Sequence, residues 1–313
     1  MASAPLHERE LAQANAGSRT VSRRDERARA RFGLLLAAPA VLIFVAIIGY
    51  PLVQSVITSL YDASLLRPGR AWVGLENFRS VLGGSTFWPI LRATGVFVLG
   101  TTGLGVALSF LWALFLNESF PGRNVLRGLS LIPWIVPSTV GGFLWLWMFH
   151  GQFGVINGFL RTLGVLDRPI VWLASPAWAQ AAVILARVWQ AMPWYTLLLL
   201  AGLQGIDRQI LEAARVDGAG NLRLVTRVIL PQVRFILFLT TMLALIGNLQ
   251  HFDLIWVMTG GGPGRATATF SVEVYQQAFQ RWDTGTAAAI GVLWMGFISV
   301  VAFFYLRRLD VGE

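Results

Sequence analysis

The chain of 313 residues contains no cysteine and no lysine. Without cysteine, disulfides, thiolate catalysis and cysteine-ligated metal sites are excluded. Without lysine, a nucleotide-binding loop of the Gly-x-x-x-x-Gly-Lys-Ser/Thr type cannot form. The three histidines, His7, His150 and His251, lie in separate segments and lack the spacing of metal ligands. These absences argue against an enzyme, and we expect no metal site in this chain.

Charged residues are also scarce. They make up 13% of the chain, against roughly 25% in a soluble domain, whereas hydrophobic residues make up 55%. The formal net charge is +9, and all 25 basic residues are arginines. The arginines stand beside apolar runs instead of gathering on a soluble domain, which favours a membrane protein over a nucleic-acid-binding one. The composition therefore predicts an all-α polytopic membrane protein.

Six apolar runs are long enough to cross a membrane, which takes roughly 20 residues. They cover residues 33–59, 90–116, 126–149, 179–204, 234–258 and 286–306. The first run is too long for a signal peptide and no small-residue cleavage site is obvious, so we expect a retained span. We expect residues 1–31 to form a basic cytoplasmic tail and residues 32–313 to form the transmembrane domain.

The arginines also orient the spans. With the N-terminal tail in the cytoplasm, sixteen arginines lie on the cytoplasmic side and seven on the outer side. This asymmetry predicts that both termini are cytoplasmic. It also places the polar segment 205–233 in the cytoplasm. Among the outer loops, Leu75–Leu82 and Phe270–Trp282 are expected to be helical, and Gly260–Gly264 is expected to break the chain.

The 205–233 segment reads as two short helices separated by glycines. Asp207 is a plausible N-cap for the first helix, and Gly218 and Gly220 are expected to end it. The small pair Ala213–Ala214 suits a helix that inserts into a cleft on another protein. From physics alone, a mere cytoplasmic hairpin between two spans is equally open.

The second helix of this segment is predicted to begin at Asn221 as its cap. Leu222, Val225 and Ile229 recur at helical spacing and predict an apolar stripe. Pro231 has no N–H, so we expect it to kink the chain as it enters the next span.

The motif in this segment resembles the EAA loop of permease subunits in binding-protein-dependent ABC importers. The matching residues are Glu212, Ala213, Ala214, Gly218, Val228, Leu230 and Pro231, with Val228 where the family often has isoleucine. The run Asp217–Ala219 is similar to the sugar-type branch, which includes maltose-type and glycerol-phosphate-type permeases. Further similar motifs follow the family's order: Gly74–Phe78, Ile132–Trp134, Phe153–Asn157, Trp189–Pro193, Phe252–Asp253 and Thr259–Pro263.

The resemblance implies an ABC importer type I permease fold of six spans in a bacterial inner membrane. It implies a second homologous permease, an ATPase dimer and a periplasmic or extracellular substrate-binding protein as partners, besides membrane lipid. No cofactor is then expected in this chain, because ATP and Mg²⁺ would be bound by the ATPase. The residues expected to couple the permease to that ATPase are Glu212, Ala213, Ala214, Arg215, Asp217, Gly218 and Pro231. No nucleic-acid partner is expected.

Polar groups inside spans mark the expected substrate pathway. The candidates are Asn248, Trp189, Gln190, Trp194, Phe252, Asp253 and Arg187. Asn248 and Phe252 are predicted to share a helical face, where an amide and an aromatic ring suit a sugar. Hydrogen bonding between helices is the alternative role for each candidate, and Asp253 is also open to a structural role.

Two readings stay open for Arg187, which snorkels to the outer face or faces the cavity. A cavity-facing arginine would favour an anionic solute, which keeps glycerol phosphate or another polar solute as an alternative to a sugar or oligosaccharide. A secondary transporter is a more remote alternative, because neither coupling carboxylates in spans nor an inverted repeat is clear.

Overall fold

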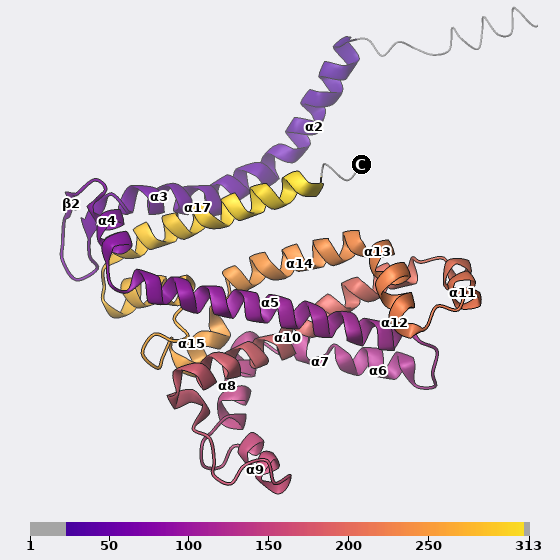
Figure 1. Cartoon of the computed structure of the whole chain (residues 1–313). Coiled ribbons are helices and arrows are strands. Elements are labelled where there is room, and N and C mark those ends of the chain that lie inside the picture. Colours follow the sequence, from indigo (N-terminus) through magenta and orange to yellow (C-terminus); the bar gives the residue numbers. More distant parts are fainter. Residues whose placement is uncertain (1–22, 310–313) are drawn as a thin grey trace, which may run out of the picture. The chain divides into compact units, whose positions relative to one another are not determined.

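The computed structural model describes residues 23–309 (Figure 1). Most of the predicted basic tail, residues 1–22, lies outside the described residues. From Arg23 the chain is helical, so the predicted tail and the first span join without a break in helix. The chain divides into two units, residues 1–54 and 55–313.

The first unit contributes one long apolar helix. It consists of α2 (Arg23–Phe44), the π-helical turn η1 (Val45–Gly49) and the beginning of α3 (Tyr50–Thr58). Residues Arg31–Thr58 form a 28-residue helix that is long and apolar enough to cross a membrane. This helix matches the first predicted span.

The second unit holds the remaining elements. They are β1 (Tyr61–Ala63), β2 (Arg70–Trp72), α4 (Glu76–Gly83), α5 (Phe87–Asn117), α6 (Arg123–Ser130), α7 (Ile132–Ile135), α8 (Ser138–Met148), α9 (Val155–Thr162), η2 (Trp172–Ala174), α10 (Pro176–Gln204), α11 (Arg208–Val216), α12 (Asn221–Arg223), η3 (Leu224–Ile229), α13 (Leu230–Gln232), α14 (Arg234–Leu249), α15 (Asp253–Thr259), α16 (Phe270–Tyr275), η4 (Gln276–Gln280) and α17 (Thr284–Leu309). The two strands pair antiparallel with Tyr61 opposite Trp72.

The long helices α5, α10 and α17 match the second, fourth and sixth predicted spans. Helices α5 and α10 pack along each other and against α14. One end of this bundle carries α6, α11 and α12, and the other carries α4 and α15 (Figure 1). We call these the α11 end and the α4 end.

The third predicted span is not one helix. Helices α6 and α7 meet α8 at an angle of 94°. The break falls at Val136, which is extended (φ −64°, ψ 125°) because the following Pro137 disfavours the helical conformation in the residue before it. The prediction of a continuous helix over 126–149 was therefore wrong.

The fifth predicted span is also interrupted. Helix α14 ends at Leu249 and α15 starts at Asp253, so residues 234–258 are not continuous. The freed carbonyl of Leu249 accepts a hydrogen bond from Trp294 Nε1 at 3.1 Å. A tertiary contact from α17 thus stabilises a helix end that no proline or glycine follows, although Gly247 stands in the last turn. At its other end, α14 is bent by 75° from Asn221–Gln232.

Two main apolar clusters hold the second unit together. Near the α11 end, Phe110, Leu116, Leu199, Leu224 and Ile229 are buried together. Toward the α4 end, a larger cluster joins α5, α10, α15, α16 and α17. The helices predicted at Leu75–Leu82 and Phe270–Trp282 are present as α4 and as α16 with η4.

Candidate functional site

Helix α11 is an exposed helix with one packed side. Asp207 caps it, because its carboxylate accepts a hydrogen bond from the backbone N–H of Gln209 at 2.9 Å, as predicted. Leu211 and Ala214, three residues apart, pack against the apolar cluster of the α11 end. Glu212 and Ala213 are exposed on the other side. The cap and the packed side hold the helix in place while its outer side stays free.

The turn after α11 is a Schellman motif centred on Gly218. Its φ is +81°, in the left-handed region that favours glycine. The N–H of Ala219 donates to the Ala214 carbonyl, and the N–H of Gly218 donates to the Arg215 carbonyl, both at 3.0 Å. These two bonds satisfy carbonyls that the helix end leaves free. The predicted helix stop at Gly218 is confirmed, and the turn is rigid in its hydrogen bonding.

The second helical piece differs from its prediction in two ways. Gly220, not Asn221, occupies the N-cap position, and it makes no side-chain cap. Of the predicted stripe, Ile229 is buried and Val225 packs against the same cluster, but Leu222 is 78% exposed and Leu224 is buried instead. The reason is that η3 is π-helical, so residues five apart share a face.

The 75° bend comes just after Pro231, at Val233 (φ −95°, ψ 8°), in line with the predicted kink. Arg215, Asp217 and Pro231 are exposed, and Val216 is 87% exposed. The 205–233 segment therefore presents a mixed apolar and charged surface on a fixed scaffold.

A polar cluster lies inside the bundle at the middle of α10. Arg187 Nε donates to Asn248 Oδ1 at 2.9 Å, and Arg187 Nη1 donates to Gln190 Oε1 at 3.2 Å. Asn248 Nδ2 donates in turn to Thr102 Oγ1 at 3.1 Å. Ser138 Oγ donates to Gln190 Oε1 at 3.1 Å. Three predicted pathway residues, from α10 and α14, are thus brought together, and Arg187 does not snorkel to the surface.

The predicted aromatic residues lie around this cluster without entering it. Trp194 stacks on Trp134 with ring centroids 5.1 Å apart. Trp189 meets Trp145 edge-on at 5.7 Å. Both are partly exposed. The side chain of Trp189 points to α8, because it stands about 200° around the helix from Arg187.

The predicted pairing of Asn248 with Phe252 was wrong. The helix ends between them, and Phe252 packs instead on Tyr275, with ring centroids 5.0 Å apart. Asp253 is exposed in the first turn of α15. These two residues belong to the α4 end of the molecule, and only Asn248 belongs to the polar cluster.

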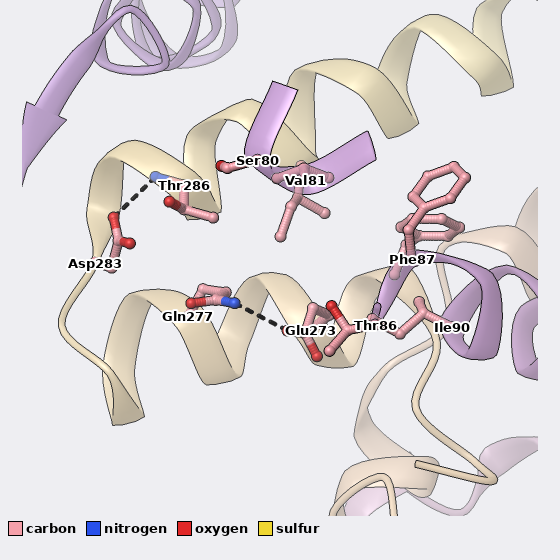
Figure 2. Close-up of a pocket in the computed structure, with 11 residues that line it drawn as sticks. Ser80, Val81, Thr86, Phe87, Ile90, Glu273, Gln277, Asp283 and Thr286 are labelled. Atoms are coloured by element: carbon pink, nitrogen blue, oxygen red, sulfur yellow. Dashed lines mark hydrogen bonds between the residues drawn. The ribbon is translucent and has the colours of Figure 1, made fainter. Parts of the chain in front are cut away.

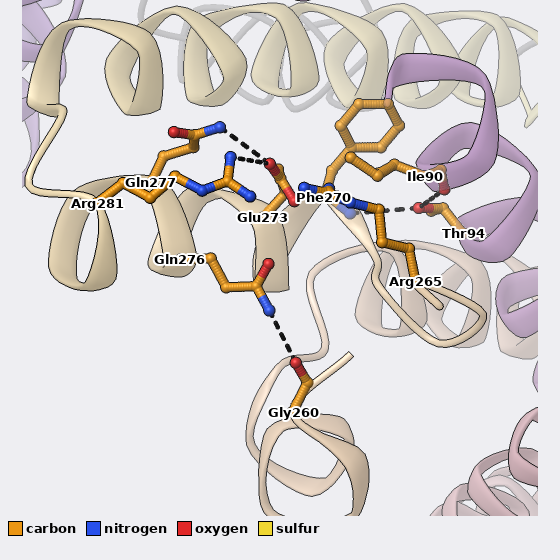
Figure 3. Close-up of polar contacts among 9 residues, drawn as sticks. All are labelled: Ile90, Thr94, Gly260, Arg265, Phe270, Glu273, Gln276, Gln277 and Arg281. Atoms are coloured by element: carbon orange, nitrogen blue, oxygen red, sulfur yellow. Dashed lines mark hydrogen bonds and ion pairs between the residues drawn. The ribbon is translucent and has the colours of Figure 1, made fainter. Parts of the chain in front are cut away.

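A buried carboxylate that the sequence reasoning missed organises the loop before α17. Glu273 is 1% exposed. Its carboxylate accepts from Arg265 at 2.6 Å, from Gln277 at 3.0 Å and from Arg281 at 3.3 Å (Figure 3). The available signal was a lone acid between apolar residues in a helix predicted to lie at the membrane. These three contacts link the loop before α16 to η4 and to the residue that follows it.

A cavity of about 220 Å³ lies beside this carboxylate, between α4, the start of α5, α16 and α17 (Figure 2). Part of its polar lining is already bonded: Gln277 donates to Glu273, and the Thr286 N–H donates to Asp283 Oδ1 at 2.9 Å. Val81, Phe87 and Ile90 supply apolar walls. The bonded carboxylates and the apolar walls favour a packing gap over a solute site.

Loops are held by hydrogen bonds from two asparagines, Asn77 and Asn157, which belong to the motifs that resemble the family. Asn77 Nδ2 donates to the carbonyls of Ser59 and Tyr61, both at 2.9 Å. Asn157, which is 2% exposed, receives the indole N–H of Trp172 at 2.9 Å and bonds the backbone of Ile170 in both directions. These motif residues shape the loops.

Comparison with known proteins agrees with this arrangement. The family described as "Binding-protein-dependent transport system inner membrane component" matches residues 105–311. The trehalose/maltose transport system permease protein MalF of Thermococcus litoralis is 35% identical over 278 residues, covering 89% of this chain and 93% of the relative. The sulfoquinovosyl glycerol transport system permease protein SmoG of Agrobacterium fabrum is 34% identical, covering 90% and 91%.

A solved structure shares the fold. It is the crystal structure of a bacterial ABC transporter involved in the import of the acidic polysaccharide alginate, with a TM-score of 0.75 at 20% identity. The match covers 93% of this chain and 100% of that chain.

Proposed function

The chain belongs to the family of binding-protein-dependent transport system inner membrane components, and from that membership we propose that it is the permease subunit of an ATP-driven importer of a sugar or oligosaccharide. The relatives named for trehalose, maltose and sulfoquinovosyl glycerol support this solute class.

The proposed mechanism depends on the exposed surface of α11 and on the hydrogen-bonded turn that follows it. Glu212, Ala213 and Val216 form a free surface, while Leu211 and Ala214 tie the same helix to the bundle. A partner that moves this surface moves the packed cluster with it, because close-packed side chains transmit strain. The partner is an ATPase pair that binds ATP and Mg²⁺, and this chain contributes no catalytic group.

Movement of α11 reaches the pathway through packing. The cluster at the α11 end contains Leu199 and Leu203 of α10, and the same helix carries Arg187 and Gln190 further along. Closure of the ATPases shifts the helices between alternative packings, which alternately open the two ends of the pathway. A second permease completes the pathway, a substrate-binding protein delivers the solute at the α4 end, and the α11 end and both termini lie in the cytoplasm.

Uptake into membrane vesicles tests the proposal. Right-side-out vesicles containing this chain, the second permease and the ATPase, with the binding protein outside, should accumulate a radiolabelled sugar only when ATP is enclosed in the vesicle lumen. Omission of the binding protein or of the ATPase should abolish uptake. Sugar accumulation that persists without the ATPase would instead identify a secondary transporter.

A further inference from the structure

The cation in the polar cluster is Arg187, which bonds only the neutral side-chain oxygens of Asn248 and Gln190. Among the residues whose side chains the structure describes, no carboxylate lies within 4.0 Å of its guanidinium. Arginine stays protonated in proteins and presents five N–H donors. Two of these donors are used here, so the guanidinium keeps donors for a further acceptor.

The cluster holds this cation in one orientation. Asn248 is fixed by Thr102 on α5, and Gln190 is fixed by Ser138 on α8. Each amide therefore turns its oxygen toward Arg187. Both amides are at most 5% exposed, whereas Arg187 is only partly buried. An ionised group placed among spans in this way marks a solute pathway more often than a packing site.

A second cation, Arg92, lies at the α4 end on α5, the helix that packs along α10. A cavity of about 540 Å³ there is lined by Trp88, Arg92, Gln180 and the loop around Ala266. No carboxylate lies within 4.0 Å of Arg92 in the described part of the chain. The other arginine of this cavity, Arg265, is already paired with Glu273.

The cavity and the polar cluster lie along the same face of α10. Gln180 and Arg187 are seven residues apart on one face of α10, a rise of about 10 Å. A second space, of about 10 Å³, lies beside Gln180 and is lined by Phe97, Ile184 and Thr267. The helix pair α5 and α10 thus carries two such cations, Arg92 beside the cavity at the α4 end and Arg187 in the polar cluster further along the bundle.

We propose that the transported solute is an acidic sugar, whose carboxylate, sulfonate or phosphate group binds Arg92 on entry and Arg187 in the middle of the membrane. The inference depends on the proposed function, since it specifies the solute of that same pathway. Trp88, 68% exposed in the cavity wall, offers a ring face for the sugar's C–H groups. The guanidinium of Arg187 supplies charge-assisted hydrogen bonds to the anion.

Uptake of four radiolabelled probes by cells expressing the complete importer tests this. Trehalose and maltose are the neutral probes, and a galacturonate disaccharide and glucose 6-phosphate are the acidic ones. The wild type is expected to accumulate an acidic probe. Arg187→Gln should lower that uptake by about 10-fold to 100-fold, the effect of losing charged hydrogen bonds, and Arg187→Lys should restore part of it.

Two further variants distinguish an effect on solute passage from an effect on folding and assembly. Arg92→Gln, in an open cavity, should slow acidic uptake several-fold. Arg161→Gln, an exposed arginine on α9, should leave it unchanged. Co-purification of the ATPase with each variant shows that the complex is assembled.

Three results overturn the inference. Accumulation of neutral probes alone rejects it while leaving the proposed function intact. Loss of ATPase co-purification in Arg187→Gln but not in Arg187→Lys means that a partner chain neutralises Arg187. Accumulation of none of the four probes counts against both the inference and the proposed sugar import.

Discussion

Substitution of Gly218 tests whether the hydrogen-bonded turn after α11 couples the permease to the ATPase. Its φ of +81° disfavours any other residue, yet an added Cβ would meet no atom within 4 Å. The cost of Gly218→Ala is therefore backbone strain alone, about 1–2 kcal/mol. Gly220 is an internal control, because it is equally open but has φ −67°. Gly220→Ala should be neutral or stabilising by about 0.4–1 kcal/mol.

The strain should appear in binding of the ATPase. A cost of 1–2 kcal/mol lowers the population of the intact turn by a factor of about 5–30. Titration of the ATPase onto the permease in lipid nanodiscs should show Gly218→Ala weakened by up to that factor and Gly220→Ala unchanged. Gly218→Pro also deletes the N–H that bonds the Arg215 carbonyl. That variant should insert into the membrane but lose ATP-driven uptake.

Equal ATPase affinities for Gly218→Ala and Gly220→Ala would refute the reasoning, because the two variants differ only in backbone strain. Normal solute-driven uptake by Gly218→Pro would refute it as well. Either result would mean that the geometry of this turn does not determine coupling.

Three further substitutions test the loops at the α4 end. Glu273→Gln removes the charge shared by two arginines and should lower stability by about 2–3 kcal/mol, read as a lower melting temperature in detergent; an unchanged value would mean that the pairs contribute nothing. Asn157→Ala leaves the Trp172 indole N–H unpaired, which costs about 1–3 kcal/mol, and should speed proteolysis of the 150–172 loop. Gly261→Ala (φ +93°) places a Cβ 3.0 Å from a neighbouring side chain, whereas Gly264→Ala (φ +54°) meets open space; thermal stability should fall more in the first, and equal losses would contradict the steric argument.

The sequence was sufficient for features set by local chemistry. The Asp207 cap and the Gly218 stop depend on hydrogen bonds within a few residues, and both are present. The bend after Pro231 is local in the same sense. The apolar stripe holds at Val225 and Ile229 but not at Leu222, because η3 is π-helical and a 3.6-residue period does not describe it. Leu222 was consequently assigned to the buried face although it is exposed.

Features that depend on contacts between distant residues could not be predicted from the sequence. The carbonyl at the end of α14, Leu249, is bonded by Trp294, 45 residues away, and Gly247 alone does not fix where the helix stops. The shared face of Asn248 and Phe252 was lost with that break. Arg187 was recognised as unusual, but its orientation is set by Asn248 on another helix, and only the structure gives that. Hydropathy finds apolar runs, and it does not report whether a run is one straight helix.

The break before Pro137 has a consequence for how permeases of this family diverge. The Val136 carbonyl, released from helical bonding, accepts from Gln190 Nε2 at 3.4 Å, 54 residues along the chain. An unpaired carbonyl in hydrocarbon costs several kcal/mol. Among homologues, the proline and the glutamine should therefore covary. Chains with a continuous third span are free to place an apolar residue at position 190, and chains that keep the break must keep a donor there.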